Sequence, residues 1–486
     1  MTMWSAKRSA YLYQRFFWEV FAISRLFSLV VTLVGLVNYA AVERRWSPDA
    51  VATVDLAVNR GSPQHLASGI IYGIPDIPNQ IPDHFYTDIG LHWFRAGGGQ
   101  MTEPNRGWSW GDAEMEKRWK STLSNYKTVR KYNGKFLLLL HDLCGTNFTD
   151  ESMEWPGDNG DWANYDRFLD TIISRVIDND MLPGLYIDIW NEPEWGFWKR
   201  PQAQWLDMFG RAMNRFRSDD RLGEVQLIGP SLSLPPTEDN TWWSNFLSYI
   251  AANNSAPDLY TWHHIEALDN PANDLQNSLV TFNNMRSAAG APEKPININE
   301  YLNLADELNP AATVWHLSRF ERYDTSGLRS NWRGGPDGSH LRDFLASLIW
   351  RDDENLPYHP NGDWQALKYY NLNMTGYRAG TTGSDDRIFD VYATVGNDKV
   401  RALAGVRVKT GTWALTFKNL SAVGLPPAGE PKIQTWGFTY EIPEAELDAP
   451  TDRGIVTHSY TNDEITIAIY QTEEDWKTAW AFEFLV

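Results

Sequence analysis

The feature that most constrains the fold is a regular alternation of short apolar segments with helical patterns between residues 67 and 332. The apolar segments have the composition of strands that are buried on both faces, as in a parallel sheet. Eight of them, each followed by a helical pattern, predict a (β/α)8 TIM barrel, an α/β fold. An open doubly wound sheet is the alternative, but that fold usually has a glycine-rich phosphate loop after its first strand, and this sequence has none there. The predicted strands are 67–75, 92–98, 135–142, 185–193, 225–232, 259–267, 295–301 and 326–332, and the clearest helical patterns are 113–132, 162–178, 202–218 and 311–324.

The period with which apolar residues recur along the sequence changes at about residue 386. From there to residue 486, alternating apolar and polar residues are separated by turn residues, without helical patterns between them. This pattern predicts a C-terminal antiparallel β-sandwich. One isolated strand pattern at 52–61 has no place in the barrel. We therefore expect the region 42–65 to add an N-terminal strand to the sandwich, and the barrel to span 66–385.

The first 41 residues have the pattern of a targeting segment rather than of a folded domain. Basic residues precede an apolar run at 26–37, and small residues follow it. This order is typical of a secretory signal peptide, and the run is shorter than the roughly 20 residues of a membrane span. We predict cleavage near Ala40 or Ala41, with retention as a signal anchor as the alternative. Four glycosylation sequons support a secreted, extracellular, N-glycosylated protein; they begin at Asn147, Asn253, Asn373 and Asn419.

Charge and aromatic content narrow the choice of partner. The formal net charge of −19 disfavours nucleic acid and anionic membranes. The chain has 24 tryptophans, whose flat rings suit the C–H faces of sugars. These observations favour a carbohydrate partner, with no nucleic acid, and with no membrane in the mature form unless the leader is retained as an anchor.

The ends of the predicted strands carry the residues of chemical interest, because catalytic residues of (β/α)8 barrels lie at the carboxyl ends of the strands. Two Asn-Glu pairs stand there, Asn191-Glu192 on the fourth strand and Asn299-Glu300 on the seventh. Carboxyl groups on opposite strands of a narrow barrel can approach to the roughly 5–5.5 Å that retaining glycosidases use. The other strand-end candidates for substrate binding or support are Arg95, His141, Asp142, His263, His264, Tyr301 and Trp332.

Retaining hydrolysis requires the two carboxyl groups to have different pKa values. Arg95 beside one glutamate would hold it ionised, as a nucleophile needs, whereas the aromatic surroundings of Glu192 favour its protonated form. Asn191 could donate to a sugar hydroxyl. Trp195 and Trp198 are candidate walls of a sugar subsite, with packing in the core as an equal alternative. This chemistry needs no metal and no organic cofactor.

A second possible cluster contains His141, Asp142 and Cys144. Its residue types would suit a metal site or a thiol nucleophile. However, the sequence has no further cysteine and no second cluster of cysteine and histidine that would complete a zinc site. We therefore predict no metal site, and we expect these residues simply to follow the apolar strand at 135–142.

Two of these motifs resemble those of a known group of enzymes. "WNEP" at 190–193 and "INEY" at 298–301 resemble the acid/base and nucleophile motifs of clan A glycoside hydrolases. The resemblance implies that Glu192 is the acid/base and Glu300 the nucleophile. Arg95, within "RAGGG", and Trp332 match the arginine of strand two and the aromatic residue of strand eight in that clan.

The predicted architecture narrows the resemblance further. A barrel with a sandwich built from both chain ends is similar to glycoside hydrolase family 39, which includes β-xylosidases and α-L-iduronidases. Strand six departs from the pattern, because "TWHHIEA" has no tyrosine at its end and offers His263 or His264 instead. The segment 356–376 has no counterpart. We therefore expect a divergent, fungal branch of that family.

The sequence thus predicts a secreted retaining glycoside hydrolase that cleaves plant or microbial poly- or oligosaccharides. One alternative is an endo-acting, cellulase-like glycanase of the same clan. Another is a non-catalytic carbohydrate-binding protein of the cell wall, although a binding protein has no need for a pair of glutamates.

Overall fold

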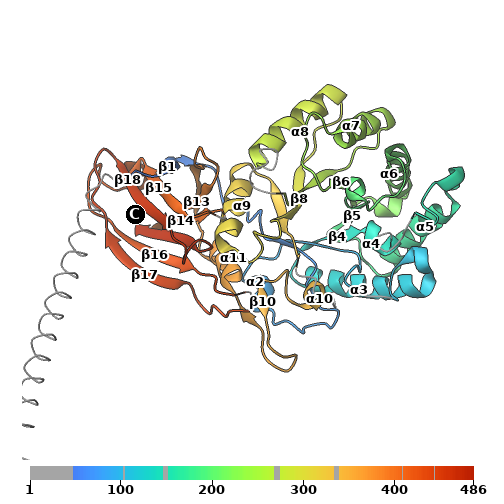
Figure 1. The fold of residues 1–486 in the computed structure, drawn as a ribbon, viewed down its shortest axis with the longest axis horizontal. Helices are drawn as coiled ribbons and strands as arrows, with labels where there is room; N and C mark the ends of the chain where they lie inside the picture. Colours follow the sequence, from blue (N-terminus) through green and yellow to red (C-terminus); the bar gives the residue numbers. More distant parts are fainter. Residues whose placement is uncertain are drawn as a thin grey trace, which may run out of the picture. The chain divides into compact units, whose positions relative to one another are not determined.

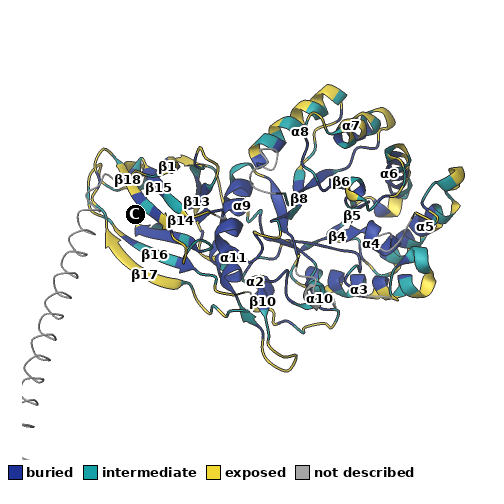
Figure 2. Cartoon of the chain, viewed as in Figure 1, coloured by how far each residue is buried: buried dark blue, intermediate teal, exposed yellow. Residues whose placement is uncertain are grey.

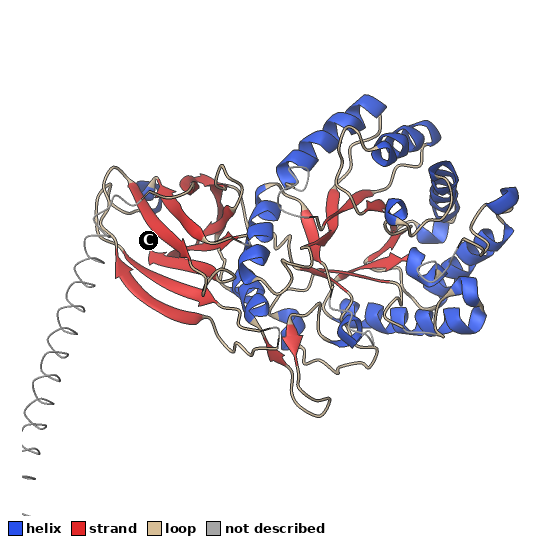
Figure 3. Cartoon of the chain, in the orientation of Figure 1, coloured by secondary structure: helices blue, strands red, loops and turns tan. Residues whose placement is uncertain are grey.

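The structure is a computed structural model that describes residues 47–101, 104–145, 151–266, 274–332, 339–407, 409–442 and 444–486. Residues 50–486 form one compact unit. This unit contains both a barrel and a large β-sheet, coloured by sequence in Figure 1 and by secondary structure in Figure 3.

The barrel is closed by eight parallel strands that pair in chain order, which confirms the predicted (β/α)8 architecture. Its strands are β2 (Gly69–Ile71), β3 (Trp93–Ala96), β4 (Lys135–Leu139), β5 (Leu185–Asp188), β6 (Gln226–Leu232), β7 (Leu259–His264), β8 (Ile296–Tyr301) and β9 (Ser326–Arg329). The helices around it are α2 (His84–Thr87), α3 (Asp112–Lys131), α4 (Leu140–Cys144), α5 (Ala163–Asp178), α6 (Gln202–Arg217), α7 (Thr241–Asn253), α8 (Leu275–Ala289), α9 (Pro310–Arg322), α10 (Ser339–Asp343) and α11 (Gly362–Leu372).

The inside of the barrel is apolar at one level and polar at the next. Side chains of one interior cluster, including Trp93 and Leu259, fill the level nearer the amino ends of the strands. Two residues further along the same strands come Arg95 and Thr261, both buried. Because side chains on one face of a strand recur every second residue, these residues also point inward. The polar level therefore lies towards the carboxyl ends of the strands, where the candidate site was predicted.

Besides the barrel, the fold contains a nine-stranded sheet with its own apolar core. Its strand order is β17-β16-β19-β14-β13-β12-β1-β15-β18. The N-terminal strand β1 joins it, as predicted, between β12 and β15. All pairs are antiparallel except β1 with β15, because β1 comes from the other end of the chain and no hairpin sets its direction. The strands are β1 (Val51–Asn59), β12 (Tyr377–Thr382), β13 (Phe389–Val395), β14 (Lys399–Val406), β15 (Gly411–Lys418), β16 (Lys432–Phe438), β17 (Thr451–Thr457), β18 (Glu464–Gln471) and β19 (Ala479–Leu485).

Helix α9 joins the barrel to the nine-stranded sheet, since it follows barrel strand β8 and packs on β13 and β14 of the sheet. Residues 310–321 of α9 are all buried, and Figure 2 shows the helix almost entirely in the colour of buried residues. The backbones approach closely: a Cβ atom on Gly405 would lie 2.2 Å from the carbonyl oxygen of Ala311. Such contact makes the sheet an integral part of the fold.

The predicted targeting segment, residues 1–41, lies outside the described residues, as does the sequon at Asn147, so secretion and glycosylation stay predictions. Asn253 and Asn373 are exposed, whereas the side chain of Asn419 donates to Asp55. No helix among the described residues is long and apolar enough to cross a membrane.

Candidate active site

The centre of the polar level is Arg95 on β3, whose side chain is almost completely buried. Its guanidinium donates from Nε to Asp188 (2.8 Å), from Nη1 to Glu300 (2.8 Å) and from Nη2 to Oδ1 of Asn191 (2.7 Å). One planar cation with a fixed fork of donors therefore fixes the positions of groups from β5 and β8. The structure places Arg95 beside Glu300, as the sequence analysis expected of the nucleophile.

A β-bulge on β8 directs Glu300 into the site. Ile298 pairs with Trp262 and Glu300 pairs with the next residue, His263, so Asn299 is the extra residue of the bulge. Bulges change the direction of side chains locally and are frequent beside active sites. Because of the bulge, the side chains of two consecutive residues point into the barrel. Asn299 donates to Asp188 and Ser231, and Glu300 accepts from Arg95.

Glu192 lies beyond the end of β5, directly before the short 3-10 helix η4 (Pro193–Trp195). Its backbone is left-handed, with φ of 42°, which is an uncommon conformation for a residue with a side chain and is frequent at functional sites. Its N–H group donates to the carbonyl oxygen of Ser231, 3.0 Å away on β6. This contact ties the glutamate to the neighbouring strand and directs its carboxyl group over the mouth of the barrel.

The two carboxyl groups meet there, because oxygen atoms of Glu192 and Glu300 lie within 4.8 Å of each other. Retaining glycosidases have catalytic carboxyls about 5–5.5 Å apart, whereas inverting enzymes need about 6.5–9.5 Å to fit a water molecule. An oxygen-to-oxygen approach this close is nearer to the spacing of retaining enzymes than to that of inverting enzymes.

His263 on β7 lies between the two glutamates. Its Nδ1 atom is 2.9 Å from Oε1 of Glu192, and its Nε2 atom is 3.7 Å from Oε1 of Glu300. Burial lowers the pKa of His263 to about 4, so the ring is neutral at neutral pH and has one N–H donor. If Nε2 carries that proton and faces the anionic Glu300, Nδ1 is left to accept a proton from the carboxylic acid of Glu192. This tautomer suits an ionised Glu300 and a protonated Glu192.

Burial raises the pKa of all four carboxyl groups at this site, and Arg95 opposes that rise in Asp188, Glu192 and Glu300. Burial raises the pKa of Glu192 to about 7 and that of Asp142 to about 8. Burial also raises the pKa of Glu300, but His263 and the adjacent Arg95 oppose that rise. The cation lies against Asp188 and Glu300, so it favours the ionised form of those two groups.

This pKa gives a prediction for the pH dependence of activity. If Glu192 is the general acid, it acts in its protonated form, which is present below pH 7 and lost as the pH rises through about 7. We expect kcat/KM on an unactivated glycoside to fall about tenfold per pH unit above that point. A pH–rate profile measures this, and a profile that stays flat to pH 9 would contradict the assignment.

A pocket with a volume of about 250 Å³ opens beside Glu192, slightly smaller than the roughly 300–1,000 Å³ of typical ligand pockets. Two indoles form walls, those of Trp195 and Trp332, which are 72% and 39% exposed. Loops after β6 and β7 complete it. Its lining residues are Glu192, Trp195, Ser233, Leu234, Ile265, Glu266 and Trp332.

The side chains of three predicted site residues point away from the site. Trp198 is buried and packs edge-on against Trp190 and Trp155, so it belongs to the core and is not a pocket wall. His264 faces the helices, where its Nε2 atom is 2.9 Å from the hydroxyl of Ser278. Tyr301 also points out of the barrel and donates to the carbonyl oxygen of Ala67. Both follow an inward-pointing residue on their strand, so alternation turns them outward.

His141 and Asp142 lie in the first turn of α4 rather than at a strand end. The His141 ring is 3.0 Å from Asp142 and packs on Trp190 and Phe197. A Cβ atom on Gly99 would lie 2.6 Å from the Asp142 carboxyl, so this glycine allows the close approach. Glu300 is among the groups that raise the pKa of Asp142, which places Asp142 near the catalytic centre.

The sequence analysis missed Asp188, the buried carboxyl group at the centre of this network. It accepts from Arg95, from the Ser231 hydroxyl (2.8 Å) and from Asn299. Its signal in the sequence is an aspartate inside the otherwise apolar run "LYIDIW". Glu194 was missed too; burial raises its pKa to about 7, and it holds Ser233 and Leu234 of the pocket wall.

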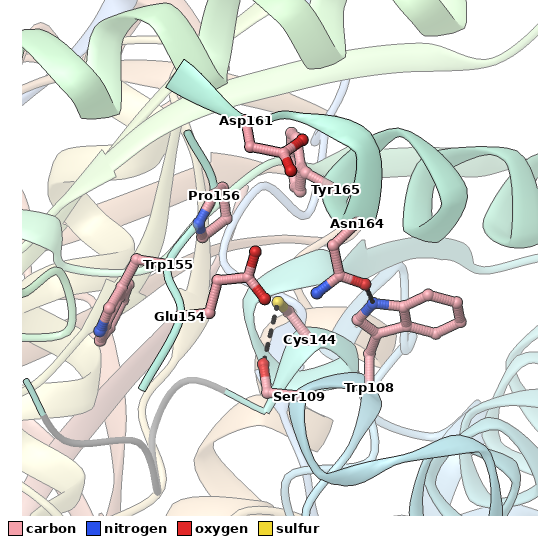
Figure 4. A pocket seen from close by; sticks show the side chains of 9 residues that line it. All are labelled: Trp108, Ser109, Cys144, Glu154, Trp155, Pro156, Asp161, Asn164 and Tyr165. Carbon is pink, nitrogen blue, oxygen red and sulfur yellow. Dashed lines mark hydrogen bonds between the residues drawn. The ribbon is translucent and has the colours of Figure 1, made fainter. Parts of the chain in front are cut away.

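Neither alternative chemistry is supported by the residues around Cys144. Burial raises the pKa of its thiol to about 12, so a reactive thiolate is disfavoured. Figure 4 shows the sulfur facing the hydroxyl of Ser109, 3.8 Å away, in a cavity of about 20 Å³ that has room for one water molecule.

Among the described residues, one group could surround a cation: Glu192, His263 and Glu300. A shared metal ion needs one lone pair from each residue aimed at a single point. Here the two nitrogens of His263 face different carboxyl groups. Arg95 beside Glu300 also disfavours a second cation. The arrangement therefore fits a proton-transfer site better than a metal site.

Solved structures with the same architecture include glycoside hydrolases. One is a family 39 glycoside hydrolase from Xanthomonas axonopodis pv. citri, with 12% identity, a TM-score of 0.56, and coverage of 90% of this chain and 98% of that one. The chain has the barrel-and-sheet fold of glycoside hydrolases. A monomeric β-xylosidase from Caulobacter crescentus CB15 is also similar, with 14% identity, a TM-score of 0.54, and coverage of 90% and 99%.

A higher TM-score, 0.69, is found for N2152 from Neocallimastix frontalis, with 22% identity and coverage of 90% of this chain and 99% of that one. The predicted resemblance to clan A, with family 39 among its members, is thus confirmed at the level of the fold. No protein-family model matches the sequence, and no curated protein matches it.

Proposed function

We propose that this protein is a retaining glycoside hydrolase with Glu300 as the nucleophile and Glu192 as the acid/base. The observation that carries the proposal is the pair of carboxyl groups within 4.8 Å of each other, one bound to Arg95 and the other beside a pocket with indole walls. The solved structures named above support the general class of reaction, since they include a β-xylosidase and a family 39 glycoside hydrolase.

The geometry suits the two steps of double displacement. In the first step the Glu300 carboxylate attacks the anomeric carbon, while Glu192 gives its proton to the leaving oxygen. In the second step Glu192, now ionised, takes a proton from water, which attacks the glycosyl-enzyme and releases Glu300. His263 lies between the two carboxyl groups, with Nδ1 2.9 Å from Glu192 and Nε2 3.7 Å from Glu300, so its buried ring can hold both groups in position through the two steps.

Asn191 is placed to position the sugar beside the reacting carbon. Its Oδ1 atom accepts from Arg95, which fixes the plane of the amide and with it the direction of the Nδ2 donor on the other branch. A hydroxyl group next to the anomeric carbon is the natural acceptor, because hydrogen bonds at that position strengthen in the transition state of glycoside hydrolysis.

The proposed substrates are poly- or oligosaccharides of plant or microbial origin. The exposure of Trp195 at the rim favours a second candidate, an endo-acting glycanase, because an indole there could carry a further sugar unit of a long chain.

Hydrolysis of a panel of aryl glycosides and polysaccharides, with Glu300→Gln as the blank, tests the proposed function and distinguishes exo from endo action. Single sugars released from chain ends indicate exo action, and a spread of oligomers indicates endo action. If no member of the panel is cleaved faster by the wild-type enzyme than by the blank, the proposed function is wrong.

A further inference from the structure

The sheet contacts the loop that follows the proposed nucleophile strand. Arg407, directly after β14, donates from Nε (2.9 Å) and Nη2 (2.5 Å) to Oδ2 of Asp306, and both side chains are 1% exposed. Asp306 lies between β8 and α9. Burial alone would raise the pKa of Asp306, but Arg407 and His316 hold it below its ordinary value. A buried ion pair therefore fixes this loop to the sheet.

The loop itself, residues 302–309, is a compact unit. The N–H group of Asp306 donates to Oδ1 of Asn303 (2.9 Å), and the N–H group of Glu307 donates to the Asn303 carbonyl oxygen (3.0 Å). At its end, the side chain of Asn309 caps α9 by accepting from Ala312. These bonds transmit the position of Asp306 to its neighbours in the loop.

The same loop holds one wall of the substrate pocket. The carboxylate of Glu307 accepts from the backbone N–H of Trp332 (3.2 Å), and the Leu302 carbonyl oxygen accepts from the indole Nε1–H (2.8 Å). Asn303 donates to the carbonyl oxygen of Glu266 (3.1 Å), and Glu266 also lines the pocket. The loop therefore contacts the backbone or side chain of two lining residues.

We propose that Arg407 is a positioning residue, through which the sheet sets the place of the Trp332 wall. This inference rests on the proposed function for its effect on substrate. The sequence of contacts runs from Arg407 to Asp306, through the loop 302–309, to the two hydrogen bonds on Trp332. The sheet is then a part of the substrate site, although its strands lie outside the barrel.

The test compares two charge-balanced double variants of matched chemistry. Arg407→Met with Asp306→Asn removes the ion pair without leaving one charge buried alone. Arg322→Met with Asp390→Asn removes another buried arginine–aspartate pair between α9 and the sheet, at the end of α9 away from the loop. Both remove similar interactions from the same contact region, but only the first touches the loop.

We expect KM on the best substrate to rise about three- to tenfold in the first variant. A change of this size corresponds to weakening the contact between the substrate and one aromatic ring, that of Trp332. Because Glu192 and Glu300 are untouched, kcat should change less than about twofold. The matched variant should keep the KM of the wild-type enzyme. Equal effects on KM in both variants, or no effect in the first, would overturn the positioning role.

Hydrogen–deuterium exchange gives a readout that does not depend on activity. We expect the amides of Asp306, Glu307 and Trp332 to exchange faster in the first variant than in the wild-type protein or the matched variant. Unchanged exchange would overturn the proposal. If the wild-type protein cleaves no glycoside, the proposed function fails by itself, and exchange alone then decides whether Arg407 holds the loop.

Discussion

Replacement of Glu300 by glutamine should lower kcat by more than about 10⁴-fold, at or beyond the upper end of what loss of a general acid or base costs. The amide keeps the shape of the side chain but cannot form the bond to the anomeric carbon. The loss should be as large for activated aryl glycosides as for ordinary ones, because every substrate needs the nucleophile in the first step. Single-turnover rates on both kinds of substrate measure this.

A matched control for this variant is Glu321→Gln on α9. Glu321 is also buried and paired with an arginine, Arg378, but it faces the sheet side of the barrel. It should keep kcat within about twofold, since it does not touch the site. Melting temperatures of both variants check that each is folded. Near wild-type activity in Glu300→Gln would exclude Glu300 as the nucleophile.

Replacement of Glu192 by alanine should have an effect that depends on the leaving group. On an unactivated glycoside we expect a loss of about 10²–10⁴-fold, the usual contribution of a general acid/base. On a substrate with an acidic leaving group the first step should survive, since such a group departs without a proton. The second step should slow, because no base remains to activate water, and the glycosyl-enzyme should accumulate.

Azide distinguishes the two glutamates in these variants. In Glu192→Ala a small anion can occupy the space left by the carboxyl group and attack the glycosyl-enzyme without a base, giving a glycosyl azide of retained configuration. In Glu300→Ala azide would replace the nucleophile and give the inverted product. NMR of the products reads the configuration. Exchanged outcomes would mean that the two roles are reversed.

The barrel could be predicted because its strands and helices have local patterns. The apolar segments gave all eight strands, and the Asn-Glu pairs at 191–192 and 299–300 marked the mouth. The sheet was predicted from its two-residue period, and β1 was assigned to it because the barrel had no place for it. Its parallel pairing with β15 has no local signal, since it depends on where the chain returns in space.

The residues that the sequence analysis misplaced are those whose orientation depends on tertiary packing. Strands of a parallel barrel are buried on both faces, so hydrophobicity does not tell inward His263 from outward His264. The bulge at Asn299 changes the alternation on β8, and nothing in "INEY" predicts it. Trp195 and Trp198 differ only in what surrounds them, a pocket for one and other indoles for the other.

The most direct measurement of the central claim is the mass and position of the glycosyl group on Glu192→Ala. After incubation with an activated aryl glycoside that the wild-type enzyme cleaves, intact-mass spectrometry should show one added glycosyl residue. Peptide mapping should place it on Glu300. A label on a different residue, or rapid turnover to a product of inverted configuration with no labelled protein at any time, would contradict the proposed double-displacement mechanism.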